Sequence, residues 1–255
     1  MNQDILIGIF IPFFGTAIGS GLVLFMKRDF NFFLEDFLSA LAGGIMTAAA
    51  VWSLIIPATE DSAHLGPLAF LPSCVGIAVG VMFMIYLSRI TEKIFLKIST
   101  EASHKNVNTL LAVTIHNIPE GMAVGSVYAA AIEHQSKSLF ATALAVSVGI
   151  AVQNIPEGAV ISMPLYAGGM KKSKALLYGA LSGIVEPVGA GLALIMAKAL
   201  GVLLPYFLTF AAGAMLFVVT QQLIPDIRYR GKIPLTGIAF TLGFMIMMSL
   251  DVALS

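Results

Sequence analysis

Eight long apolar runs divide the sequence, and each is long enough to cross a lipid bilayer as an α-helix. A helical span needs about 20 apolar residues. Only 11% of the 255 residues are charged, whereas soluble proteins carry about 25% charged residues. The sequence therefore predicts an all-α integral membrane protein, a single transmembrane domain over residues 1–255 with eight transmembrane helices. The predicted spans are residues 5–26, 37–57, 68–90, 108–131, 139–166, 175–198, 202–224 and 233–254.

The basic residues predict how these spans are oriented. Of the 14 Lys and Arg residues, twelve fall in or beside the first, third, fifth and seventh connections, and only Lys137 and Lys198 do not. Short loops that are rich in Lys and Arg stay on the cytoplasmic side. We therefore expect a multi-pass protein of the cell membrane, plasma or inner, with its N-terminus and C-terminus outside. The third connection, residues 91–107, is expected to be a long cytoplasmic loop.

Charge and cysteine content exclude several classes of protein. The formal net charge is zero, so there is no electrostatic reason to expect a nucleic-acid partner. Cys74 is the only cysteine, which excludes a disulfide within the chain and a Cys-based metal site. The sequence has no phosphate-binding loop that could supply energy from ATP. The function must therefore depend on the few polar residues inside the spans.

Two nearly identical hexapeptides stand in the fourth and fifth spans. The first is HNIPEG at 116–121 and the second is QNIPEG at 153–158, so five of six positions agree. At 1.5 Å per residue, Glu120 lies roughly 18 Å from the start of its span and Glu157 roughly 14 Å from the end of its own. Both carboxylates are therefore expected near the middle of the membrane.

The spacing inside each hexapeptide suits the binding of an ion. The first and fifth residues, His116 with Glu120 and Gln153 with Glu157, are four apart and share one helix face. Proline at the fourth position lacks an N–H group, so it frees a backbone carbonyl and is expected to kink the helix. Irregular backbone is tolerated inside a membrane only where it is buried or lines a wet cavity.

A third acid, Glu186, lies at a similar depth in the sixth span, about 17 Å from its start. A charged side chain at mid-membrane costs ~2.5 to 3.5 kcal/mol even on the insertion scale, and no Lys or Arg lies nearby to neutralise these three acids. Carboxylates, amides and one imidazole, with no thiolate, suit a borderline to hard divalent cation. A closed structural zinc site would instead use four strong ligands. The pattern therefore favours an exchangeable metal ion over a structural one.

The paired motifs, the span count and the sixth-span acid resemble the ZIP (Zrt/Irt-like protein) family of divalent metal transporters, prokaryotic type, over the whole chain. In that family the two motifs and the sixth helix build a two-metal centre midway through the membrane. The resemblance implies that the first ion binds His116, Glu120, Gln153 and Glu157, with Met46 of the second span as a candidate further ligand. It implies that the second ion binds Asn117, Glu120, Asn154, Glu157 and Glu186, with the glutamates bridging.

Some positions depart from the family pattern. Asn154 stands where many relatives have Asp, and Gln153 stands where others have His, which lowers the negative charge and the basicity of the centre. Gln221 and Gln222 replace a His-Glu pair that some relatives place on the cytoplasmic exit path. The third connection holds only one histidine, His104, where many relatives have a histidine-rich loop. These differences concern the second ion and the exit path.

The resemblance implies a transporter and not an enzyme. It would import a divalent ion into the cytoplasm without a catalytic cofactor. Zinc is the expected ion, and cadmium, iron(II) and manganese are further candidates. The residues alone leave two alternatives, an intramembrane metalloenzyme and a proton-coupled carrier of an organic solute. Zinc proteases show the motif His-Glu-x-x-His, which has two histidines. Here His116 is the only His within a predicted span, so this motif is absent from the spans and the metalloenzyme is disfavoured. The expected partners are divalent ions and the lipid bilayer. A homodimer, the physiological metal and the choice between channel and carrier stay open.

Other polar residues have structural interpretations. Glu60, Asp61 and His64 cluster in the outer second connection, where they are expected to form a solvated loop, with a metal-gathering mouth as the alternative. Asp36 and Asp226 lie at cytoplasmic ends of spans and are expected to be exposed boundary charges, with a part in the exit path of the ion as the alternative.

Overall fold

The structure is a computed structural model that describes residues 3–26, 32–95, 101–133, 135, 137–199, 203–224 and 233–254. Within these residues the chain is helical and contains no strand. The elements are α1 (Gln3–Gly21), η1 (Leu22–Phe25), α2 (Phe32–Ala49), η2 (Ala50–Ile55), α3 (Ile56–Asp61), η3 (Ser62–Leu68), α4 (Phe70–Phe95), α5 (Glu101–Glu133), α6 (Lys137–Ala167), α7 (Lys172–Ser182), α8 (Val185–Ala199), α9 (Leu204–Val218), η5 (Val219–Leu223) and α10 (Ile233–Leu254).

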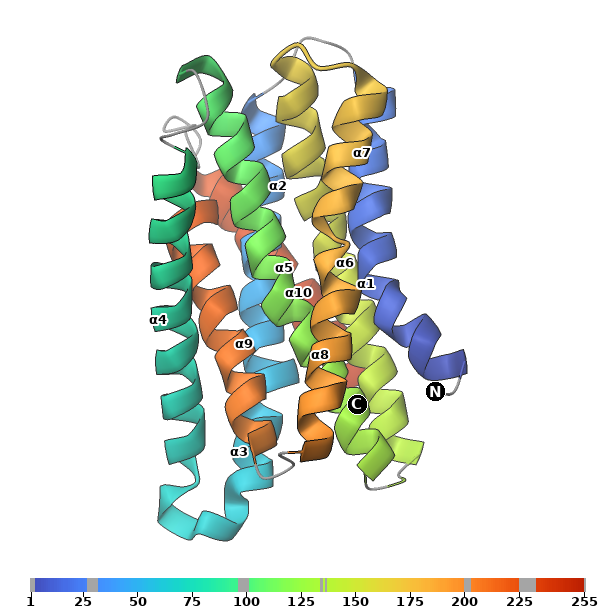
Figure 1. Cartoon of the computed structure of the whole chain (residues 1–255), viewed down its shortest axis with the longest axis vertical. Helices are drawn as coiled ribbons and strands as arrows, with labels where there is room; N and C mark the ends of the chain where they lie inside the picture. Colours follow the sequence, from blue (N-terminus) through green and yellow to red (C-terminus); the bar gives the residue numbers. More distant parts are fainter. Residues whose placement is uncertain are drawn as a thin grey trace.

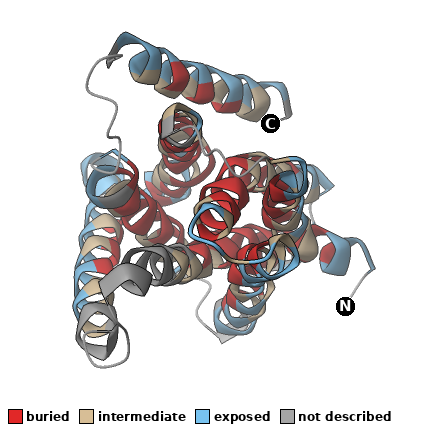
Figure 2. Cartoon of the chain, turned by 90° about the horizontal axis from the view of Figure 1, so that it is seen from above, coloured by how far each residue is buried: buried red, intermediate tan, exposed pale blue. Residues whose placement is uncertain are grey.

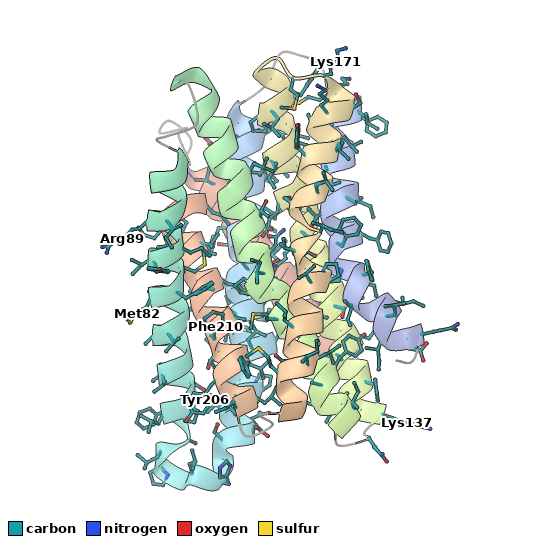
Figure 3. All side chains as sticks on the ribbon, in the orientation of Figure 1. Met82, Arg89, Lys137, Lys171, Tyr206 and Phe210 are labelled. Carbon is teal, nitrogen blue, oxygen red and sulfur yellow. The ribbon has the colours of Figure 1, made fainter. Side chains whose placement is uncertain are left out.

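Long helices lie side by side along the long axis of the molecule (Figure 1). Seven helical segments of the described chain are long and apolar enough to cross a membrane. The 33-residue α5 is also long enough, but it is more polar and is not among the seven. The all-α membrane fold predicted from the sequence is confirmed. Figure 3 shows Lys137 of the fourth connection and Lys171 of the fifth at opposite ends of the bundle.

The predicted long loop at 91–107 is wrong where the structure describes it. Helix α4 continues to Phe95, and α5 already begins at Glu101, so both ends of the connection are helical. The physical reason is that residues 91–107 contain neither Gly nor Pro, the residues that most often end a helix. The apolar pattern does not reveal the polar turns that extend these two helices.

The sixth predicted span is divided into α7 and α8. Pro187 has no N–H group to donate to the carbonyl of Gly183, four residues earlier. That carbonyl instead accepts the backbone N–H of Glu186 at 3.0 Å. Glu186 therefore lies in the first turn of α8. The N-terminus of a helix favours negative charge because its N–H groups point outward.

The long helices pack as two groups. We call α1, α5, α6, α7 and α8 the site group, because they include both hexapeptides and Glu186; its closest pairs are α1 with α6 and α5 with α8. We call α2, α4, α9 and α10 the frame group; its closest pairs are α2 with α10 and α4 with α9. The two groups meet mainly where α5 packs on α9 and α2 packs on α6. Figure 2 shows α10 at the edge of the bundle and buried residues in the interior.

Glycine allows the backbones within each group to touch. In the site group, Gly15 and Gly19 of α1 lie so close to the backbone of α6 that no Cβ would fit. In the frame group, Gly80 of α4 lies equally close to the backbone of α9, and Gly213 of α9 lies equally close to the backbone of α4. Between the groups, Gly149 of α6 meets only the flexible end of the Met247 side chain in α10. Small residues that let backbones approach closely are the usual packing device of membrane helices.

Candidate metal centre

The structure buries five polar residues of the two hexapeptides in the interior of the site group. Asn117 and Glu120 of α5, and Gln153 and Asn154 of α6, are 0% exposed, and Glu157 is 2% exposed. Helices α5 and α6 continue through the prolines of both motifs. Buried polar groups are costly in an apolar environment unless they are partnered. The centre therefore depends on what these side chains bind.

Close packing of α5 on α8 brings Glu186 to the same place. Gly121, the last residue of the first hexapeptide, abuts the backbone of Glu186 so closely that no side chain would fit there. Gly189 of α8 in turn lies against the backbone of Ile118 in α5, again with no room for a side chain. Glu186 is 0% exposed. Each of the three carboxyl groups lies within electrostatic range of the other two.

Hydrogen bonds hold one end of most of these side chains. The Gln153 Nε2 amide group donates to Glu120 Oε1 at 2.7 Å. Asn117 Nδ2 donates to Glu186 Oε1 at 3.1 Å and to the Ser182 carbonyl at 3.4 Å. Asn154 Nδ2 donates to the carbonyl of Pro12 at 3.4 Å. The amide nitrogens thus point to protein acceptors.

The opposite ends of the same side chains are acceptor oxygens without a hydrogen-bond partner among the described residues. They are Asn117 Oδ1, Glu120 Oε2, Gln153 Oε1, Asn154 Oδ1 and Glu186 Oε2. All five atoms are buried, and all belong to residues that the sequence singled out as ligands. A buried oxygen needs a proton donor or a cation. Carbonyl and carboxylate oxygens suit hard and borderline divalent cations.

Two predicted ligands are not joined to this set. His116 belongs to α5, but its side chain lies outside the described residues. Met46 of α2 is buried in the apolar core, and no described contact joins its sulfur to the carboxylates. Among the described side chains, no three from His, Cys, Asp and Glu are close enough to hold one metal ion. An ion at this centre would therefore need the amide oxygens as well as the carboxylates.

Sequence reasoning missed two polar contacts of the spans. Thr16 of α1 is 0% exposed and donates its hydroxyl to Glu186 Oε1 at 2.8 Å. Ser53 of η2 donates to both carboxylate oxygens of Asp251 in α10, at 2.8 and 2.9 Å. Asp251, the only acid in its predicted span, was the available signal for the second contact. For Thr16 the only signal was the Gly15-xxx-Gly19 spacing around it, which predicts close packing of α1.

The remaining polar residues agree only in part with expectation. Glu60, Asp61 and His64 are exposed, as expected. The expected loop is wrong, because Glu60 and Asp61 end α3 and His64 lies in η3, with its Nδ1 atom 3.1 Å from the Asp61 carbonyl. The expected exposure of Asp36 is wrong, because this side chain is only 3% exposed. It belongs to α2, which packs against α6 and α10. Asp226 lies outside the described residues.

Comparison with known proteins identifies the chain's relatives. A family model described as ZIP zinc transporter matches residues 106–251. Zinc transporter ZIP11 of Xenopus tropicalis is 33% identical, with 98% of this chain and 96% of the relative covered. Zinc transporter GufA of Myxococcus xanthus is 35% identical over 94% and 95%. Zinc transporter ZIPB of Bordetella bronchiseptica is 31% identical over 95% and 78%.

The range of the family model includes both hexapeptides and Glu186. The matches to ZIP11 and GufA extend over nearly the whole chain. They exclude the metalloenzyme alternative, because the family consists of transporters. The chain therefore belongs to the ZIP zinc transporter family of multi-pass membrane proteins.

Proposed function

We propose that this protein imports zinc into the cytoplasm through a centre between α5, α6 and α8. The ligands would be the oxygens of Asn117, Glu120, Gln153, Asn154, Glu157 and Glu186, together with the imidazole of His116 and the thioether of Met46. The observation that carries the proposal is the set of five buried acceptor oxygens that have no partner among the described residues. Zinc as the ion is supported by the family and by the printed names of the relatives.

The ligand chemistry suits an ion that must leave again. A structural zinc site is closed by four strong ligands, whereas amide oxygens bind weakly and can exchange. Two ions would bind at this centre. The first would be bound by His116, Glu120, Gln153 and Glu157. The second would be bound by Asn117, Asn154 and Glu186 and by the bridging Glu120 and Glu157. Manganese, iron(II) and cadmium are chemically compatible with the same donors.

The packing supports a carrier in which the site group slides against the frame group. Within each group, glycines bring backbones into direct contact, as at Gly19 and Gly213. Such contacts resist relative motion because a shift would separate two closely fitted surfaces. The glycine contact between the groups is with the flexible Met247 side chain, which can adapt. Movement at this boundary would carry the centre from one side of the membrane to the other.

Uptake of radioactive zinc into proteoliposomes tests the proposal. Glu157→Ala should abolish uptake while leaving expression and purification unchanged, because it removes a carboxylate of the centre. The matched control is Glu60→Ala at the exposed end of α3, which should at most raise the half-saturation concentration. Wild-type uptake by Glu157→Ala would show that zinc does not pass through this centre.

A further inference from the structure

Thr16 reaches the candidate centre from α1, a helix that carries none of the predicted ligands. Its Oγ1 atom lies 2.8 Å from Glu186 Oε1 and donates a hydrogen bond to it, across 170 positions of the sequence. Thr16 is 0% exposed. The contact therefore joins two buried side chains from distant parts of the chain.

This bond differs from the usual bond of a helical threonine. Thr47 and Thr209 donate to carbonyls of their own helices, those of Gly43 and Pro205, which is the common local pattern. In α1 the carbonyl four residues before Thr16 is that of Pro12, which accepts the Asn154 amide instead. One face of α1 thus contacts two predicted ligands, one helical turn apart.

The surrounding packing leaves Thr16 little freedom to move. Gly15 and Gly19, on either side of it in α1, lie against the backbone of α6 at Ala151 and Ile155. Gly183, just before α8, lies so close to the Thr16 side chain that an added Cβ would fall 2.8 Å from its Cβ. Buried groups at this density keep one conformation. The hydroxyl is therefore held in a defined position.

We propose that Thr16 is a positioning residue that orients the Glu186 carboxylate toward the metal ion. Glu186 Oε1 accepts hydrogen bonds from both Thr16 Oγ1 and Asn117 Nδ2, whereas Oε2 has no partner among the described residues. The two donors thus direct Oε2 toward the ion as the binding atom. Groups that hold a metal ligand by its other end fix its orientation and are important for affinity.

The inference rests on the proposed function, so the test includes Glu186 itself. Zinc binding to the purified protein in detergent is measured by equilibrium dialysis with radioactive zinc. Thr16→Val removes the hydroxyl and keeps the shape, and it should weaken zinc binding about 10- to 100-fold, as loss of such a partner commonly does. Thr16→Ser keeps the donor and should stay within about threefold of wild type. Thr47→Val, which removes a hydroxyl bonded only within α2, should have no effect.

A double variant separates positioning from general packing. In a Glu186→Gln background, Thr16→Val should cause no further loss, because the two residues act through one carboxylate. If Thr16→Val does not fold, the smaller Thr16→Ala takes its place with the same expectations. Wild-type affinity in Thr16→Val, or fully additive losses in the double variant, would overturn the inference alone. Unaltered zinc binding by Glu186→Gln would instead contradict the proposed function.

Discussion

The Gln153 side chain links the two hexapeptides, because its Nε2 group donates a 2.7 Å hydrogen bond to Glu120 Oε1. The bond occupies one oxygen of Glu120, while Oε2 of the same carboxylate and Oε1 of Gln153 have no partner among the described residues. Each residue thus has one end bound by the other and one end suited to a cation. One hydrogen bond therefore joins the two copies of the motif directly.

Replacing Gln153 should weaken zinc binding without unfolding the protein. Gln153→Met has a similar shape but removes the donor to Glu120 and one oxygen ligand, so the affinity should fall about 10- to 100-fold. Isothermal titration of zinc measures the change. Gln221→Met, at an exposed position of η5, is the control and should bind as wild type. Equal affinities for both variants would remove Gln153 from the centre.

Adding a carboxylate at position 154 should strengthen binding and slow release. Asn154→Asp places a further negative charge beside the second ion, and the attraction should tighten zinc binding roughly tenfold or more. An ion held more tightly leaves more slowly, so the turnover rate of uptake should fall. Gln221→Glu adds the same charge outside the centre and should leave the zinc affinity unchanged. Unchanged affinity in Asn154→Asp would indicate that no ion binds near this residue.

The candidate ligands can be picked out from the sequence, whereas the side chains that hold them in place cannot. The hexapeptides and Glu186 were visible because acids at mid-membrane are costly and stand out in an apolar run. The bond from Thr16 to Glu186 joins residues 170 positions apart, and no local pattern indicates such a contact. The division of the sixth span at Gly183 follows from the Pro187 ring, but the apolar run continues across it.

Cross-linking tests the proposed sliding of the two helix groups. In a Cys74→Ala background, cysteines at Gly149 and Met247 lie across the boundary, whereas cysteines at Phe83 and Phe210 lie within the frame group, between α4 and α9. A short thiol-reactive linker should stop zinc uptake when it joins the first pair and leave uptake intact when it joins the second. A reducible linker allows recovery to be measured. Full uptake with the first pair joined would contradict a sliding carrier.

Thiol labelling tests the orientation predicted from the basic residues. Lys171 and Lys137 are both exposed and lie at opposite ends of the bundle (Figure 3). In the Cys74→Ala background, Lys171→Cys should resist an impermeant thiol reagent in intact cells, and Lys137→Cys should react. Lys171 is preferable to Lys172, whose ammonium group donates to the Leu24 carbonyl at 2.8 Å. The reverse labelling would place both termini in the cytoplasm.

Zinc bound at the buried oxygens of α5, α6 and α8 should be visible in crystals soaked in zinc. Anomalous diffraction from such crystals locates the ions and identifies their ligands. We expect a peak about 2.0 to 2.2 Å from Glu120 Oε2, at the usual length of a zinc–oxygen bond, and its loss in Glu120→Ala crystals. Peaks confined to the exposed residues Glu60, Asp61 and His64 of α3 and η3, with none between the two hexapeptides, would show that zinc does not bind at these oxygens.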